Sequence, residues 1–303
     1  MPRKLSDIGE FGLIDKIARR IFRSKRVIKG IGDDTAVLPL NAAKQLLFTT
    51  DMLAEGVHFT KRAAPQAIGH KALACNISDI AAMGGVPTYA VVSIGLPPAL
   101  AVSYVEKIYE GINKLAKEFS VSVVGGDTIR SNKIIINIAL LGEVEKRNLT
   151  LRSCARAGDW IFVTGALGRS FPTGKHLTFI PRLKEARFLV ERFKPTAIED
   201  ISDGLAGDLG HILRASKVGA RIFEKEIPRT KSATLTQALY DGEDFELLFT
   251  LPPVKAQRLL AWQAARRSWF FYSIGRITTG NRLELVKEDG SRRLLKKEGF
   301  KHF

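Results

Sequence analysis

The stretch PQAIGHKALACNISDIAAM, residues 65–83, decides the expected fold. Its length, its proline start and its mostly apolar content predict a helix. Asp79 is the one acidic residue in this stretch. A solvated helix face does not explain a carboxylate among so many apolar neighbours, so Asp79 is a candidate functional residue.

Strand-like and helix-like segments alternate on both sides of this helix. Strands are expected at residues 35–38, 45–50, 89–94, 121–124 and 134–144, and further helices at 7–20 and 98–118. The polar stretch 145–157 has little apolar periodicity and predicts a boundary between domains 1–148 and 149–303. In the second domain, strands are expected at 160–164, 245–250 and 271–277, with a helix at 205–216. The fold class is therefore α/β or α+β in two domains.

Length and composition agree with two folded domains. The chain has 303 residues, of which 45% are hydrophobic and 26% charged, as in ordinary globular proteins. It lacks a secretory-signal pattern and an apolar run long enough to span a membrane, so we expect a cytoplasmic protein without a membrane partner. Cys75 and Cys154 suit neither a disulfide framework nor a metal pair, and both are expected to be buried thiols.

The net charge of +16 raises the alternative of a nucleic-acid-binding protein. The Lys and Arg residues are scattered over helical stretches and the C-terminal tail, and no RNA- or DNA-binding motif accompanies them. A generally basic, solvated surface is the simpler interpretation. We therefore expect no nucleic-acid partner.

Several aspartates lie among Gly, Ser, Thr and apolar residues instead of on charged helices. They occur in GDD (32–34), TTD (49–51), NISD (76–79), GGDT (125–128) and DISDG (200–204). Several follow a predicted strand directly, where α/β folds build their sites. Carboxylates gathered there would repel one another and require cations, and Mg²⁺ is the hard ion that takes carboxylate and phosphate oxygens together.

Each motif also has a purely structural interpretation. Asp-Gly commonly forms a turn, Ser-x-x-Asp commonly caps a helix, and Asp203 precedes a helical run as an N-cap would. Five such motifs in one chain favour a shared site. Known nucleotide motifs are absent, since the sequence has no complete Rossmann fingerprint, Walker A loop or protein-kinase signature. Phosphoryl transfer would therefore depend on metals held by dispersed aspartates.

The order of these motifs, with GEDFEL (242–247) and the ending GFKHF (299–303), resembles the thiamine-monophosphate kinase family over nearly the whole chain. The resemblance implies a PurM-like, two-domain fold with an N-terminal ATP- and Mg²⁺-binding domain that forms a homodimer. It implies ATP-dependent phosphorylation of thiamine monophosphate to thiamine diphosphate.

The resemblance also implies residue roles. Matches to Mg²⁺ ligands are Asp33, Thr49, Thr50, Asp51, Asp79, Asp127, Asp200 and Asp203. Matches to ATP contacts are Tyr109, Gly126, Asp127, Arg152 and Ser202. Matches to substrate contacts are His58, Glu243 and Phe300. No residue is expected to act as a general acid or base, because the attacking phosphate oxygen is already anionic and metals assist the transfer.

Three departures from the family pattern concern the substrate end: Asp241, Arg169 and a shortened segment at 165–197. Two alternatives remain beside the nucleic-acid one. The chain could be another PurM-like, ATP-dependent enzyme with a different small-molecule substrate, or a non-catalytic scaffold stabilised by metals.

Overall fold

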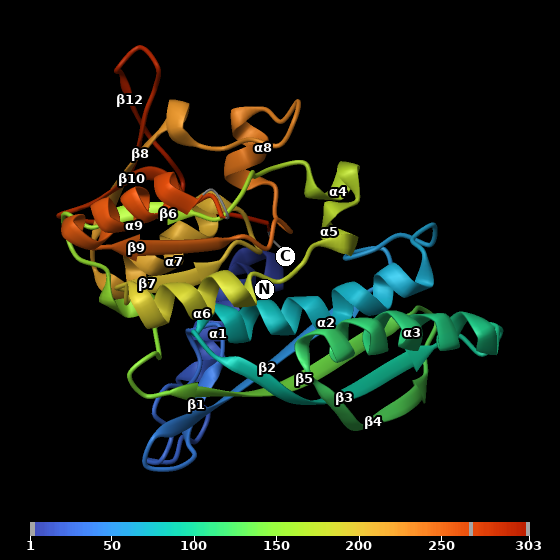
Figure 1. The fold of residues 1–303 in the computed structure, drawn as a ribbon. Coiled ribbons are helices and arrows are strands. Elements are labelled where there is room, and N and C mark those ends of the chain that lie inside the picture. The colour runs from blue at the N-terminus through green and yellow to red at the C-terminus, as the bar shows by residue number, and fades with distance from the viewer. Residues whose placement is uncertain (1–3, 267–268, 301–303) are drawn as a thin grey trace.

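A computed structural model describes residues 4–266 and 269–300 and shows two β-sheets with helices around and between them (Figure 1). The first sheet has the strand order β1-β2-β5-β3-β4. Its strands are β1 (Ala36–Pro39), β2 (Lys44–Ala54), β3 (Val86–Leu96), β4 (Ser122–Arg130) and β5 (Ile135–Glu145). Helices α2 (Pro65–Ala82) and α3 (Val102–Phe119) cover one face, as Figure 1 shows. The opposite face is called the open face below.

Alternation along β2 decides which side chains reach the helices. Leu47, Thr49 and Leu53 are buried, whereas Phe48, Thr50 and Met52 are exposed. Because successive strand residues point to opposite faces, Asp51 shares the helix-covered face with Thr49.

Helix α2 lies at the centre of the molecule and is buried on most of its surface. It packs on the first sheet and on α3, and it also contacts α6 (Leu183–Arg192) and β7 (Ala197–Asp200) of the second half. The crossing with α3 requires glycine at position 69, since a Cβ there would lie 1.9 Å from the carbonyl oxygen of Ile108. Its apolar sequence is therefore that of a core helix shared by both halves.

The second sheet has the order β12-β11-β8-β10-β6-β9-β7. Its remaining strands are β6 (Trp160–Val163), β8 (Gly219–Phe223), β9 (Leu247–Leu251), β10 (Tyr272–Thr278), β11 (Leu283–Val286) and β12 (Arg292–Leu294). Its helices are α4 (Ser170–Thr173), α5 (Lys175–Thr178), α6, α7 (Leu205–Ser216), α8 (Leu235–Tyr240) and α9 (Pro253–Arg266). Helix α1 (Gly9–Ala18) precedes the first sheet, and Leu5–Asp7, Arg152–Cys154 and Glu224–Glu226 form short 3-10 turns.

The structure confirms the α/β class and the type of every element predicted above. Strand β4 runs to Arg130, six residues beyond the predicted end, because it pairs with β3 along its whole length. The prediction for Cys154 was wrong: this thiol is exposed, because it lies in a short 3-10 turn without buried residues, whereas Cys75 is buried on α2.

None of the described helices is long and apolar enough to cross a membrane.

Candidate active site

A cavity of about 470 Å³ lies between the two halves, a size typical of small-molecule sites. Residues of both halves line it. The sequence-predicted site residues among them are Asp51, His58, Asp79, Arg152, Asp200, Ser202, Asp203, Glu243 and Phe300. The fold therefore brings together positions from 51 to 300 of the chain.

Three carboxylates meet beside this cavity, and two of them, Asp79 and Asp200, line it. Asp34, Asp79 and Asp200 each place an oxygen so that all three atoms lie within 4.8 Å of one another. They come from the loop before β1, from α2 and from the end of β7. Two hydroxyls support them: Thr49 donates to Asp79 at 2.5 Å, and Ser78 donates to Asp200 at 2.5 Å. We call this set, together with Asp51, the carboxylate end.

Burial and mutual repulsion disfavour the charged forms of these acids. The pKa of Asp34 is raised to about 7, and the pKa values of Asp51 and Asp200 are raised to about 6, in each case chiefly by burial. The pKa of Asp79 is raised well above its usual value by burial and by the charges of Asp51 and Asp200. Removing these charges from water is unfavourable unless a cation compensates.

The residues present fit a magnesium ion. Oδ2 of Asp34 is buried and has no hydrogen-bond partner among the described residues. Carboxylates and hydroxyls make up the available donors, and these oxygens are the ligands that Mg²⁺ prefers. The oxygens of Asp34, Asp79 and Asp200 are close enough to one another to share an ion.

Arg152 connects the first loop to the second half. Its guanidinium lies 2.5 Å from Asp34 Oδ1 and 3.1 Å from Glu199 Oε1. Its backbone N–H donates to Asp33 Oδ1 at 3.3 Å, and Lys29 forms an ion pair with Asp33 at 3.1 Å. Asp33 is thus held beside the carboxylate end by cations of the chain itself.

The structure places Thr50, Gly126 and Asp127 away from the carboxylate end. The Thr50 hydroxyl donates to Asn137 on the open face at 3.1 Å. Asp127 is exposed on the edge strand β4, in register with Ser93 and, across β5, with Met52 of the open face. Three strand spacings separate β4 from β2, or about 14 Å.

Gly126 and Tyr109 each have a structural role in the fold. A Cβ at Gly126 would lie 1.8 Å from the carbonyl oxygen of Val92, so the pairing of β4 with β3 requires glycine there. Tyr109 lies on α3 and packs, partly buried, against the first hydrophobic core. The cavity lining includes neither residue.

His58, Glu243 and Phe300 also line the cavity. His58 Nδ1 accepts the backbone N–H of Ala54 at 3.0 Å, so a neutral ring carries its proton on Nε2. Glu243 has a left-handed backbone with φ of 70°. The buried ammonium of Lys71 forms an ion pair with its carboxylate. Lys301, His302 and Phe303 of the predicted C-terminal motif lie outside the described residues.

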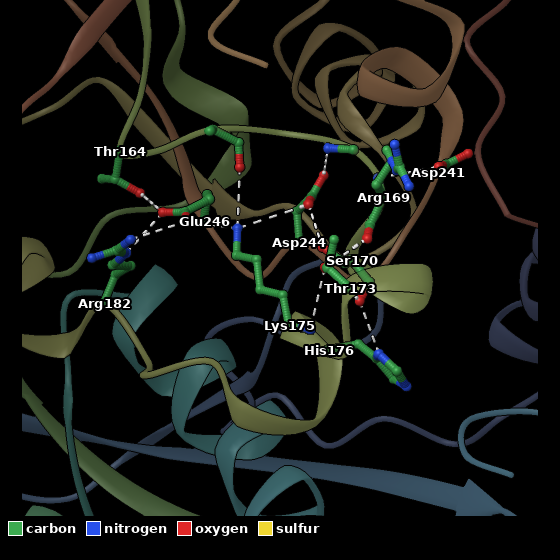
Figure 2. Close-up of polar contacts among 12 residues, drawn as sticks. Thr164, Arg169, Ser170, Thr173, Lys175, His176, Arg182, Asp241, Asp244 and Glu246 are labelled. Atoms are coloured by element: carbon green, nitrogen blue, oxygen red, sulfur yellow. Dashed lines mark hydrogen bonds and ion pairs between the residues drawn. The ribbon is translucent and has the colours of Figure 1, made fainter. Parts of the chain in front are cut away.

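The segment 242–246 is anchored from its far side (Figure 2). Glu243 and Phe245 line the cavity, while Asp244 and Glu246 point toward Lys175 (Figure 2). Asp244 accepts the Ser170 hydroxyl at 2.5 Å and the Gly168 N–H at 2.8 Å. Lys175 lies 2.9 Å from Glu246.

Arg182 and Thr164 complete this anchor on Glu246. The Arg182 guanidinium contacts both Glu246 oxygens, at 2.7 and 3.0 Å, and Thr164 donates to the same carboxylate at 2.8 Å. Two of the sequence departures also meet here, since the N–H of Arg169 donates to Asp241 at 3.2 Å (Figure 2). The shortened segment therefore packs against the 241–246 segment.

Sequence reasoning missed Asp34 and Lys71. Asp34 belongs to the quoted GDD motif, but the resemblance assigned a role to Asp33 alone. Lys71, Cys75 and Asp79 follow one another at intervals of four residues. In a helix, this interval places all three side chains on one face. The sequence signal for Lys71 was therefore a lysine on an apolar helix, on the same face as a candidate functional acid.

Comparison with known proteins identifies the class first. The family model described as AIR synthase related protein, N-terminal domain, matches residues 32–144, and its C-terminal counterpart matches 163–288. Together with two sheets and a shared cavity, these matches define a two-domain protein of the PurM-like class and confirm the predicted fold.

Full-length relatives then identify the family. Thiamine-monophosphate kinase of Aquifex aeolicus is 36% identical and covers 99% of this chain and 100% of its own length. The Bacillus subtilis enzyme of the same name is 34% identical over 98% of this chain and 100% of its own. A solved structure, AaThiL complexed with AMPPCP and TMP, is 34% identical with a TM-score of 0.87, covering 100% of both chains. The chain belongs to the thiamine-monophosphate kinase family.

Proposed function

We propose that this chain transfers the γ-phosphoryl group of ATP to the phosphate of thiamine monophosphate, forming thiamine diphosphate and ADP. The observation that carries the proposal is a cavity that is lined both by Asp79 and Asp200 of the carboxylate cluster and by His58, Glu243 and Phe300. The relative whose structure contains an ATP analogue and TMP supports the same pair of substrates.

Asp34, Asp79 and Asp200 would hold Mg²⁺, with Asp51 beside them, and Asp33, Asp203 and Thr49 as the further candidates. The bound metal would neutralise the phosphate oxygens of both substrates and favour in-line transfer. Arg152, which pairs with Asp34 and Glu199, is proposed to bind a phosphate group of ATP, and Ser202 lines the same cavity. No proton needs to be removed from the attacking phosphate oxygen.

We call His58, Glu243 and Phe300 the thiamine end, and we propose that it selects the acceptor substrate. Glu243 offers a carboxylate to the amine or cation of thiamine, and His58 can donate from Nε2. Phe300 can cover a ring or attract the thiazolium charge, an interaction of roughly 0.5 to 2 kcal/mol. The alternative is another PurM-like, ATP-dependent reaction on a different small molecule.

A coupled assay for ADP tests the proposal. ADP is expected only when ATP, Mg²⁺ and thiamine monophosphate are all present, and thiamine diphosphate is expected as the second product by chromatography. Equal ADP production without thiamine monophosphate, or with unphosphorylated thiamine in its place, would contradict the proposed acceptor.

A homodimer is part of the proposal. The open face exposes the large apolar residues Phe48, Met52, Tyr89 and Val91, and such a patch marks an interaction surface. A second copy over this face would enclose Thr50, Gly126 and Asp127. We propose that these residues make their metal and ATP contacts only in the dimer. Tyr109 is kept as a candidate ATP contact. Light scattering should give twice the mass of 33.4 kDa, and Met52→Lys should lower it toward the monomer.

We also propose that the boundary between the two domains lies between residues 148 and 149, in the interval between the two family matches. We propose the cytoplasm as the location of the protein.

A further inference from the structure

Lys71 is a charged side chain with no solvent exposure, in the middle of α2. Its ammonium donates to the His58 carbonyl oxygen at 2.9 Å and forms an ion pair with the Glu243 carboxylate. These acceptors lie 13 and 172 residues away along the chain. A buried ammonium is tolerated only with such partners, so the contacts fix the positions of all three groups.

The two acceptors of Lys71 belong to His58 and Glu243, two of the three residues that form the thiamine end in the proposed function. His58 comes from the first half and Glu243 from the second. We propose that Lys71 is a positioning residue for the acceptor substrate: it holds the His58 segment and the Glu243 carboxylate at a fixed separation across the cavity. This inference rests on the proposed function and adds a determinant of its specificity.

Helix α2 also links Lys71 to the carboxylate end of the cavity. Lys71 and Asp79 are eight residues apart on one face of α2, about 12 Å at 1.5 Å per residue. Asp79 belongs to the carboxylate end, so one rigid helix sets the distance between the two ends. An acceptor must then match that distance between its phosphate and its cationic part.

Direct contact of Lys71 with phosphate is a less suitable interpretation. The ammonium is buried and both of its recorded acceptors are protein groups, so Lys71 acts through His58 and Glu243. A merely structural role remains the alternative that an experiment must separate. Such a role would lower stability without a preference for one substrate.

The test compares Lys71→Met, Glu243→Gln and the double variant in steady-state kinetics. Lys71→Met and Glu243→Gln are each expected to raise the KM for thiamine monophosphate about tenfold and to leave the KM for ATP within about twofold. The double variant is expected to lie close to the Glu243→Gln value and far below the hundredfold product, because most of the effect of Lys71 passes through that carboxylate. Lys107→Met, on the exposed side of α3, is the matched control and should resemble the wild type.

Calorimetry with unphosphorylated thiamine provides a readout without turnover, and Lys71→Met should weaken this binding about tenfold. Three results would each overturn the inference. The first is an unchanged KM for thiamine monophosphate in Lys71→Met, and the second is an equal rise in KM for both substrates. The third is a double variant whose KM for thiamine monophosphate rises about a hundredfold, the product of the two single effects. If Lys71→Met does not fold, the double variant, which has neither charge, decides the question. Thiamine binding tenfold weaker in the double variant than in Glu243→Gln overturns the inference. Nearly equal thiamine binding in these two variants supports it. Failure of the wild type to phosphorylate thiamine monophosphate would instead refute the proposed function.

Discussion

The two ends of the cavity compensate negative charge in opposite ways. At the carboxylate end, burial and neighbouring acids raise the pKa of Asp34 to about 7 even though Arg152 pairs with it. At the thiamine end, Glu243 lies against the buried ammonium of Lys71, which belongs to the fold itself. The first end therefore requires a cation from solution, whereas the second is organised before any ligand arrives. Ligand binding at the carboxylate end should therefore depend on a metal ion. The choice of the acceptor substrate should depend on the thiamine end.

The largest expected effect comes from Asp51→Asn at the carboxylate end. Removing one anionic group at constant size should lower kcat/KM by about a thousandfold, or about 4 kcal/mol, through weaker metal and phosphate binding. The same variant should be no less stable than the wild type in EDTA, because it relieves repulsion. Steady-state kinetics and thermal unfolding measure both effects. Asp289→Asn, in an exposed turn, is the control, and near-normal turnover by Asp51→Asn would remove this residue from the site.

The next effect concerns ATP binding to the wild-type protein. Without a divalent ion the acids meet a polyphosphate of the same sign, so affinity for ATP should be about a hundredfold lower in EDTA than in Mg²⁺, or about 2.7 kcal/mol. Affinity for unphosphorylated thiamine should be the same in both buffers, because that ligand needs only the thiamine end. Calorimetry compares the four cases. Equal ATP affinity in EDTA and Mg²⁺ would contradict the division between the two ends.

A third effect is the pH dependence of stability in EDTA. The folded pKa values of Asp34, Asp51 and Asp200 lie at about 6 to 7, above the ordinary value of 3.8. The unfolded chain therefore loses these protons first, and unfolding free energy should fall as pH rises from about 4 to about 7. We expect a loss on the order of 2 kcal/mol between pH 5 and pH 8, which Mg²⁺ should abolish.

Urea unfolding at each pH measures this loss. Asp200→Asn is expected to show a smaller loss than the wild type over the same range, since it has one fewer acid to ionise. A stability that rises with pH in EDTA, with the same slope in both proteins, would show that the carboxylate end is not under repulsion.

Much of this comparison could be predicted from sequence, and the limits follow from geometry. The strand and helix that bring Asp51 and Asp79 to the site were predictable because apolar periodicity is local, whereas β7, which ends at Asp200, was not predicted. The positions of Thr50 and Asp127 were not, because strand register and the edge position of β4 are set by pairing across the sheet. Motif spacing alone grouped them with residues that lie on the opposite face.

Lys71 illustrates a second limit. Its helix and even its face could be deduced from the spacing to Asp79, but its partners lie 13 and 172 residues away. The anchor behind Glu243 is of the same kind, since Ser170 and Lys175 reach Asp244 and Glu246 only after the second half has folded. Contacts between distant segments depend on packing, which a single sequence does not encode as a local pattern.

The smallest expected effect is that of Phe300→Ala, which tests the thiamine end. Phe300 lines the cavity with 48% of its surface exposed, and its backbone N–H donates to the Asp203 carbonyl at 2.9 Å. That backbone anchor survives the substitution, so loss of the ring should raise the KM for thiamine monophosphate about tenfold, or about 1.4 kcal/mol, and leave the KM for ATP unchanged. Phe22→Ala, at a ring that is 91% exposed, is the matched control. Earlier thermal unfolding with an unaltered KM for thiamine monophosphate would instead identify Phe300 as an anchor of the C-terminal tail.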